Sequence, residues 1–114
     1  MKQNRTHTPI INLNLNEEFT KDSNKLLREL LEIFVKEIPG IQKEIKVAFD
    51  SQEIQKLDDL LHKLYGSCIY CGLDRLKLSL ETLKDSVSNG NYSEDLFNLF
   101  NKEIENVVKA VKKI

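Results

Sequence analysis

This chain places a histidine and a glycine four residues apart, in the run His62-Lys63-Leu64-Tyr65-Gly66-Ser67. An imidazole is the side chain that titrates and reacts near neutral pH. A glycine in the interior of a helix costs about 1 kcal/mol relative to alanine, and residues four apart share one helical face. The spacing therefore indicates that open space has been kept beside a reactive imidazole.

The direction of this histidine follows from the helical repeat of about 100° per residue. With His62 at zero, Leu57, Leu64 and Cys68 fall at roughly 200–240°, which predicts that they face the core. His62 alone would be a solvated surface histidine, and Gly66 alone a site of close helix packing. Because Gly66 also points away from the apolar stripe, the pair favours close approach by a molecule from outside.

Other constellations are less suited to chemistry. Cys68-Ile69-Tyr70-Cys71 is a C-x-x-C motif, but a redox motif of this kind belongs near a βαβ pattern, and a structural zinc site needs four ligands. Both cysteines fall on the apolar side, which favours buried thiols. Asp58 and Asp59 with His62 could form a weak metal site, although a solvated acidic face is favoured.

Composition favours a single soluble domain. The chain has 114 residues, of which 40% are hydrophobic and 31% charged, and its formal net charge is -1. This balance argues against nucleic-acid and membrane binding, because no basic excess is present. No apolar run approaches the ~20 residues of a membrane span, and no signal peptide follows Met1. Two cysteines without a secretory signal suggest a reducing, cytoplasmic location.

The chain divides into an N-terminal arm and a helical domain. Residues 1–16 are expected to form the arm, partly disordered, and residues 17–114 the domain. The first helix is predicted to begin near Ser23, with Asp22 or Ser23 as its N-cap. Its apolar stripe stays nearly in phase across Pro39-Gly40, which favours one kinked helix over two separate helices.

Three further helices follow at amphipathic spacing. Together with the first, they predict an all-α protein, an antiparallel four-helix bundle. The predicted helices cover residues 52–70, 73–87 and 94–113. Asp50 or Ser51 is expected to cap the first of these and Gly72 to end it. The turn Asn89-Gly90-Asn91 follows the second, and Ser93 is expected to cap the third.

The run around His62 resembles the histidine-containing phosphotransfer (HPt) domains of bacterial phosphorelays. The family pattern is a histidine, a glycine four residues later, a small residue and a second glycine at the helix end. These are His62, Gly66, Ser67 and Gly72 here. The likeness extends over residues 20–112. Within the family, the chain is similar to the C-terminal HPt module of BarA-type hybrid sensor histidine kinases.

The resemblance implies a phosphocarrier in a two-component phosphorelay. His62 would accept a phosphoryl group from an aspartate of one receiver domain and pass it to another receiver. Gly66 would give clearance, and Ser67 would keep the next position small. The module would be no enzyme and need no cofactor of its own, with Mg²⁺ expected on the partner receiver domain. The sequence has no Gly-rich phosphate loop for ATP.

The resemblance also bears on partners and location. It implies a monomer whose partners are receiver domains and the rest of a hybrid sensor kinase chain. It also implies a cytoplasmic location, with the domain as the cytoplasmic end of a membrane-anchored sensor kinase. Candidates for contact with a receiver are Gln55, Asp59, Tyr65 and Ile69. Partial burial against a neighbouring helix is the alternative for Tyr65 and Ile69.

One position departs from the common HPt pattern. Many HPt domains carry a lysine or arginine three residues after the histidine, where this chain has Tyr65. Lys63 is the nearest cation in the sequence and a candidate for contact with the phosphoryl group, but it lies about 100° around the helix from His62. The group that would stabilise the phosphoryl group is therefore left open.

Two alternative functions remain. The first is a helical-bundle adaptor that binds a receiver or another partner without phosphotransfer. The second is a metal- or redox-responsive bundle that uses Cys68 and Cys71.

Overall fold

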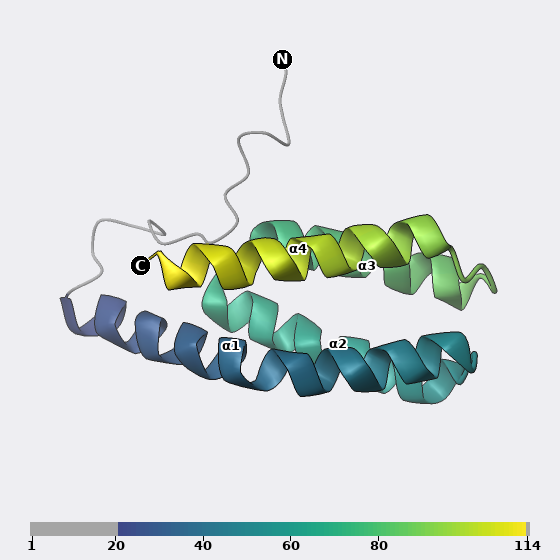
Figure 1. Ribbon diagram of the computed structural model, residues 1–114, viewed down its shortest axis with the longest axis horizontal. Helices are drawn as coiled ribbons and strands as arrows, with labels where there is room; N and C mark the ends of the chain where they lie inside the picture. Colours follow the sequence, from purple (N-terminus) through teal and green to yellow (C-terminus); the bar gives the residue numbers. More distant parts are fainter. Residues whose placement is uncertain (1–20, 114) are drawn as a thin grey trace, which may run out of the picture.

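The protein is an all-α bundle of four helices. The computed structural model describes residues 21–113, and the predictions for residues 1–16 concern a part of the chain outside this range. The helices are α1 (Lys21–Asp50), α2 (Ile54–Cys71), α3 (Asp74–Ser88) and α4 (Glu94–Lys112). Helix α2 packs between α1 and α3, and α4 closes the bundle by packing on α3 and α1 (Figure 1).

Helix α1 runs without interruption through Pro39. Proline has no N–H to donate to the carbonyl of Val35, so one helical hydrogen bond is missing at that point. The helix changes direction near its middle (Figure 1). The prediction of one helix across the proline is confirmed. The N-cap prediction is wrong, because Asp22 and Ser23 both lie inside the helix.

The connection from α1 to α2 differs from the prediction, because α2 begins at Ile54, two residues later than the sequence predicts. Helix α1 extends to Asp50, and α2 begins after Glu53, whose side chain makes no capping hydrogen bond. Gln52 has a positive φ of 54°, and the Glu53 N–H donates to the carbonyl of Ala48 at 2.9 Å. Asp50 and Ser51 are thus used by the turn, and neither caps α2.

The end of α2 is confirmed at Gly72. This glycine has φ 65° and ψ 38°, a left-handed conformation in which a side chain would be strained. The Leu73 N–H then donates to the carbonyl of Cys68 at 2.9 Å, which satisfies a carbonyl left free at the helix end. Leu73 is fully buried, so the cap also anchors the start of α3 in the core.

The last two helices begin and end as the sequence predicts, to within a residue. The turn over residues 89–91 contains Gly90 at φ 83°. The Ser93 hydroxyl accepts from the N–H of Leu96 at 3.2 Å, which caps α4. Acidic Glu94 and Asp95 in the first turn suit the positive end of the helix dipole.

The core lies along the axis of the bundle and contains side chains from all four helices. Polar contacts also join α4 to its neighbouring helices at the edge of the core. Gln42 donates to Asn101 between α1 and α4 at 3.1 Å, and Arg75 pairs with Glu103 between α3 and α4 at 3.0 Å. Among the described residues, none of the helices is both long and apolar enough to cross a membrane.

Candidate functional site

His62 lies on the outer face of α2 and is exposed. The opposite face of α2 is buried between α1 and α3 through Leu57, Leu61, Leu64 and Cys68. The core therefore fixes the rotation of α2 and directs His62 to solvent, as the helical wheel predicts. A neutral imidazole in this position presents a ring nitrogen to an approaching molecule.

Gly66 leaves open space one turn after His62. A Cβ atom placed on Gly66 would meet nothing within 4 Å, so the glycine is not needed for packing against another helix of the described structure. Ser67 follows it and is half-buried towards α1. The helix thus contains a residue of low helix propensity at a position where the free space faces outward.

Tyr65 is turned towards α3 beside the histidine. Its hydroxyl donates to Glu81 Oε2 at 3.2 Å, and the Lys77 ammonium lies 5.9 Å from the centre of its ring. The side chain is half-buried, which is the alternative that the sequence left open for it. Tyr65 therefore fixes the contact between α2 and α3 and exposes part of its ring beside His62.

Two polar pairs surround the histidine on its N-terminal side. Lys84 of α3 lies 3.7 Å from Asp58 Oδ1, and Gln55 donates to Asp59 Oδ1 at 3.1 Å. An ion pair as exposed as that of Lys84 with Asp58 contributes little to stability, about 0–1 kcal/mol. Lys63 is exposed beside His62 on the α1 side of the helix.

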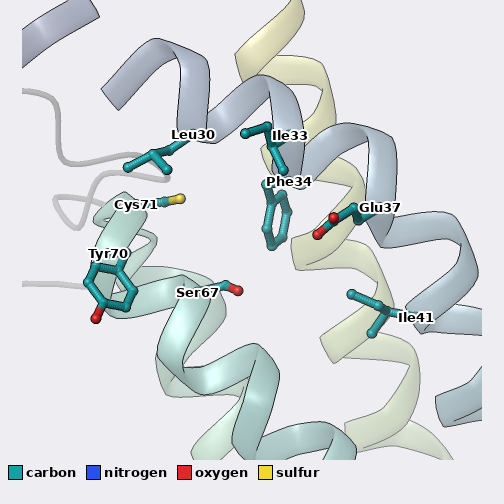
Figure 2. Close-up of a pocket in the computed structure, with 8 residues that line it drawn as sticks. All are labelled: Leu30, Ile33, Phe34, Glu37, Ile41, Ser67, Tyr70 and Cys71. Atoms are coloured by element: carbon teal, nitrogen blue, oxygen red, sulfur yellow. The ribbon is translucent and has the colours of Figure 1, made fainter. Parts of the chain in front are cut away.

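An apolar groove lies between α1 and α2, next to Gly66. It encloses about 140 Å³, and its lining comes from one face of α1 and from the C-terminal half of α2 (Figure 2). Ile33 and Tyr70 are 51% and 78% exposed there, while Ile69 on the adjoining face of α2 is 57% exposed. The lining residues are Leu30, Ile33, Phe34, Glu37, Ile41, Ser67, Tyr70 and Cys71.

The sequence did not identify the neighbours that other helices bring to this site. Ile33 of α1 was missed, as were Glu81 and Lys84 of α3, and Tyr70 of α2 itself was not singled out for this site. The signal for the groove was present in Ile33, an apolar residue off the buried stripe of its own helix. The α3 residues could be placed only once the register between antiparallel α2 and α3 was known.

Both cysteines are free and buried in the core. Burial raises the pKa of the Cys68 thiol to about 12, and the neighbouring Cys71 adds to this shift. Burial also raises the pKa of Cys71. High pKa values keep both sulfurs protonated near neutral pH and therefore weak as nucleophiles or metal ligands. No cluster of three or more metal-binding side chains occurs among residues 21–113.

The buried Cys68 thiol predicts a loss of stability at alkaline pH. The folded chain holds this proton where the unfolded chain, with an ordinary pKa of 9.0, has lost it. The contribution of Cys68 to the free energy of unfolding is complete below about pH 9. It declines as the pH rises towards 12, by at most ~1.4 kcal/mol per pH unit. Urea unfolding between about pH 9 and pH 11 should give a steeper decline for the parent than for Cys68→Ala. Equal slopes would show that Cys68 ionises in the folded chain as it does in the unfolded one.

The chain is similar to a known protein family and to known proteins. A family model described as Hpt domain matches residues 29–112. The signal transduction histidine-protein kinases BarA of Shigella flexneri and of Escherichia coli K12 are each 29% identical to the chain over 93 residues. The match covers 78% of this chain and 10% of each kinase, so the chain spans about a tenth of the length of these relatives. No solved structure matches it. The chain belongs to the Hpt domain family, the phosphotransfer modules of two-component signalling.

Proposed function

We propose that the chain carries a phosphoryl group between receiver domains and that His62 is the residue that holds it. The observation that carries this proposal is an exposed imidazole with open space over Gly66, on the outer face of a helix whose other face is buried. Membership of the Hpt family supports the class of reaction. The similarity to BarA supports a place in signalling by a histidine-protein kinase, as part of that kinase or beside it.

The transfer needs little from the chain besides a well-placed nucleophile. The lone pair of one ring nitrogen of neutral His62 forms a bond to phosphorus, while the proton stays on the other nitrogen. The bond from phosphorus to the aspartyl oxygen of the receiver breaks, and the carboxylate leaves with the electron pair. The reverse of the same step on a second receiver regenerates the imidazole. The charge that develops in such transfers is stabilised mainly by positioned cations, and the receiver's Mg²⁺ would be one of them.

The surroundings of His62 suit a receiver that docks over α2. Interfaces combine an apolar centre with a polar rim. The apolar part here is the α1–α2 groove with Ile69, and the polar part is the pair of Gln55 and Asp59. Tyr65 would contribute the exposed part of its ring. Gly66 lies between these features, where the loop that holds the phosphorylated aspartate must come within bonding distance of the imidazole.

A relay experiment tests the proposal. One receiver is phosphorylated with a radioactive label, purified, and mixed with a second receiver, either alone or with the chain present. We expect label to appear on the second receiver only when the chain is present, and to pass through an acid-labile, alkali-stable mark on the chain. Binding of either receiver without any label on the chain would favour the adaptor function instead.

A further inference from the structure

Phosphorylation of His62 would create a charge problem on this face of α2. A phosphoryl group carries about two negative charges near neutral pH. Asp58 and Asp59 lie four and three residues before His62, on the same face of the helix. The carrier would therefore place its charge beside two carboxylates, and a cation must offset this repulsion for the phosphorylated form to accumulate.

The helix that bears His62 does not supply this cation on the side that faces α3. Tyr65 stands three residues after the histidine, and its hydroxyl is bound to Glu81. Lys63 lies about 100° around the helix, towards α1. Lys77 of α3 does not supply the cation either, because its ammonium is held over the Tyr65 ring, on the C-terminal side of His62 and away from Asp58.

Lys84 of α3 reaches the right place from the neighbouring helix. Two contacts join antiparallel α2 and α3 here, from Asp58 to Lys84 and from Tyr65 to Glu81. His62 lies between Asp58 and Tyr65 along α2, so the two contacts bracket it. The Lys84 ammonium is 3.7 Å from a carboxylate oxygen that lies one helical turn from the imidazole.

We propose that Lys84 neutralises the phosphoryl group on His62 by moving to it from Asp58, which makes α3 the source of the cation that α2 lacks. This inference rests on the proposed function of His62. The side chains of Lys84 and Asp58 are 34% and 43% exposed, and an ion pair so exposed is weak enough to exchange. A dianionic phosphoryl group offers Lys84 a charge-assisted hydrogen bond, which is stronger than the 3.7 Å ion pair that the lysine gives up.

The test compares substitutions at the two ends of this ion pair. The phosphorylated fraction of the chain is measured after equilibration with a phosphorylated receiver and, separately, with phosphoramidate, a small donor that makes no docking surface. We expect Lys84→Gln to lower the ratio of phosphorylated to free chain roughly tenfold with both donors. Lys84→Arg should restore most of it, and Asp58→Asn should raise it several-fold, because the lysine is released and a like charge is removed.

The opposite signs separate this role from a structural one. Lys84→Gln and Asp58→Asn break the same contact, so a purely structural role would move both variants in the same direction. Lys46→Gln is the matched control, since it removes a lysine from the exposed pair with Asp50 on α1 and should change nothing.

The possible outcomes distinguish the two proposals. A parent chain that takes up no phosphoryl group on His62 would overturn the proposed function and this inference together. A parent that is phosphorylated while Lys84→Gln matches Lys46→Gln would overturn this inference alone. The role of Lys84 would also be wrong if substitutions at both ends of the pair shifted the equilibrium in one direction, or if Lys63→Gln alone produced the loss.

Discussion

A chain in which glutamine replaces His62 is expected to accept no phosphoryl group from a phosphorylated receiver, while it folds as well as the parent. The amide of glutamine is polar but has no nucleophilic nitrogen, so no bond to phosphorus can form. The side chain is exposed on the outer face of α2, and substitutions at such positions change stability by about 0.5 kcal/mol or less. The expected result is a loss of labelling to background with an unchanged unfolding curve.

The chain itself provides a control for this substitution. His7 is the other of its two histidines, and we expect His7→Gln to be labelled like the parent. Labelling is followed on a denaturing gel after incubation with the labelled receiver, and stability by urea unfolding. Label retained by His62→Gln, or lost by His7→Gln, would contradict the assignment of His62.

Replacing Gly66 with leucine is expected to stabilise the fold and to block transfer from a receiver at least ~100-fold. Leucine is the better helix former by about 0.8 kcal/mol, and a Cβ atom at this position meets nothing within 4 Å. Reacting atoms must come within about 3–3.5 Å for transfer. A branched side chain one turn from the imidazole would hold the receiver loop beyond that distance.

The size of the donor distinguishes lost access from lost chemistry. With Gly66→Leu we expect phosphoramidate to label His62 nearly as it labels the parent, because this small donor can approach from the open side. Asn98→Leu is the matched control, since it adds a leucine to an exposed position on α4, a helix that packs on α1 and α3. Normal transfer from the receiver to Gly66→Leu would mean that the open space has no part in docking.

The sequence was sufficient for the elements whose ends are set by one local device. Ser93 caps α4 through its own hydroxyl, and Gly72 ends α2 because its backbone adopts a left-handed conformation. The start of α2 could not be read in this way. The turn after Asp50 uses a positive φ at Gln52 and a hydrogen bond back to Ala48, and these depend on how α1 and α2 pack.

The same distinction between features set within one helix and features set by packing between helices applies to the candidate site. His62 and Gly66 share one helix, so a helical wheel sufficed to place both on its outer face. Tyr65 was ambiguous because its environment is set by Glu81 and Lys77 of α3. The α1–α2 groove and the pair of Asp58 with Lys84 needed the register of neighbouring helices, which no single stretch of sequence contains.

The central claim is that the phosphoryl group resides on His62, and localisation of the modified residue tests it most directly. The parent chain is incubated with a phosphorylated receiver, digested at alkaline pH, and the phosphorylated peptide is fragmented in a mass spectrometer. We predict one acid-labile phosphoryl group, on the imidazole of His62, which disappears when a second, unphosphorylated receiver is added. A phosphoryl group on any other residue, or an unmodified chain beside a receiver that has lost its label, would contradict the account.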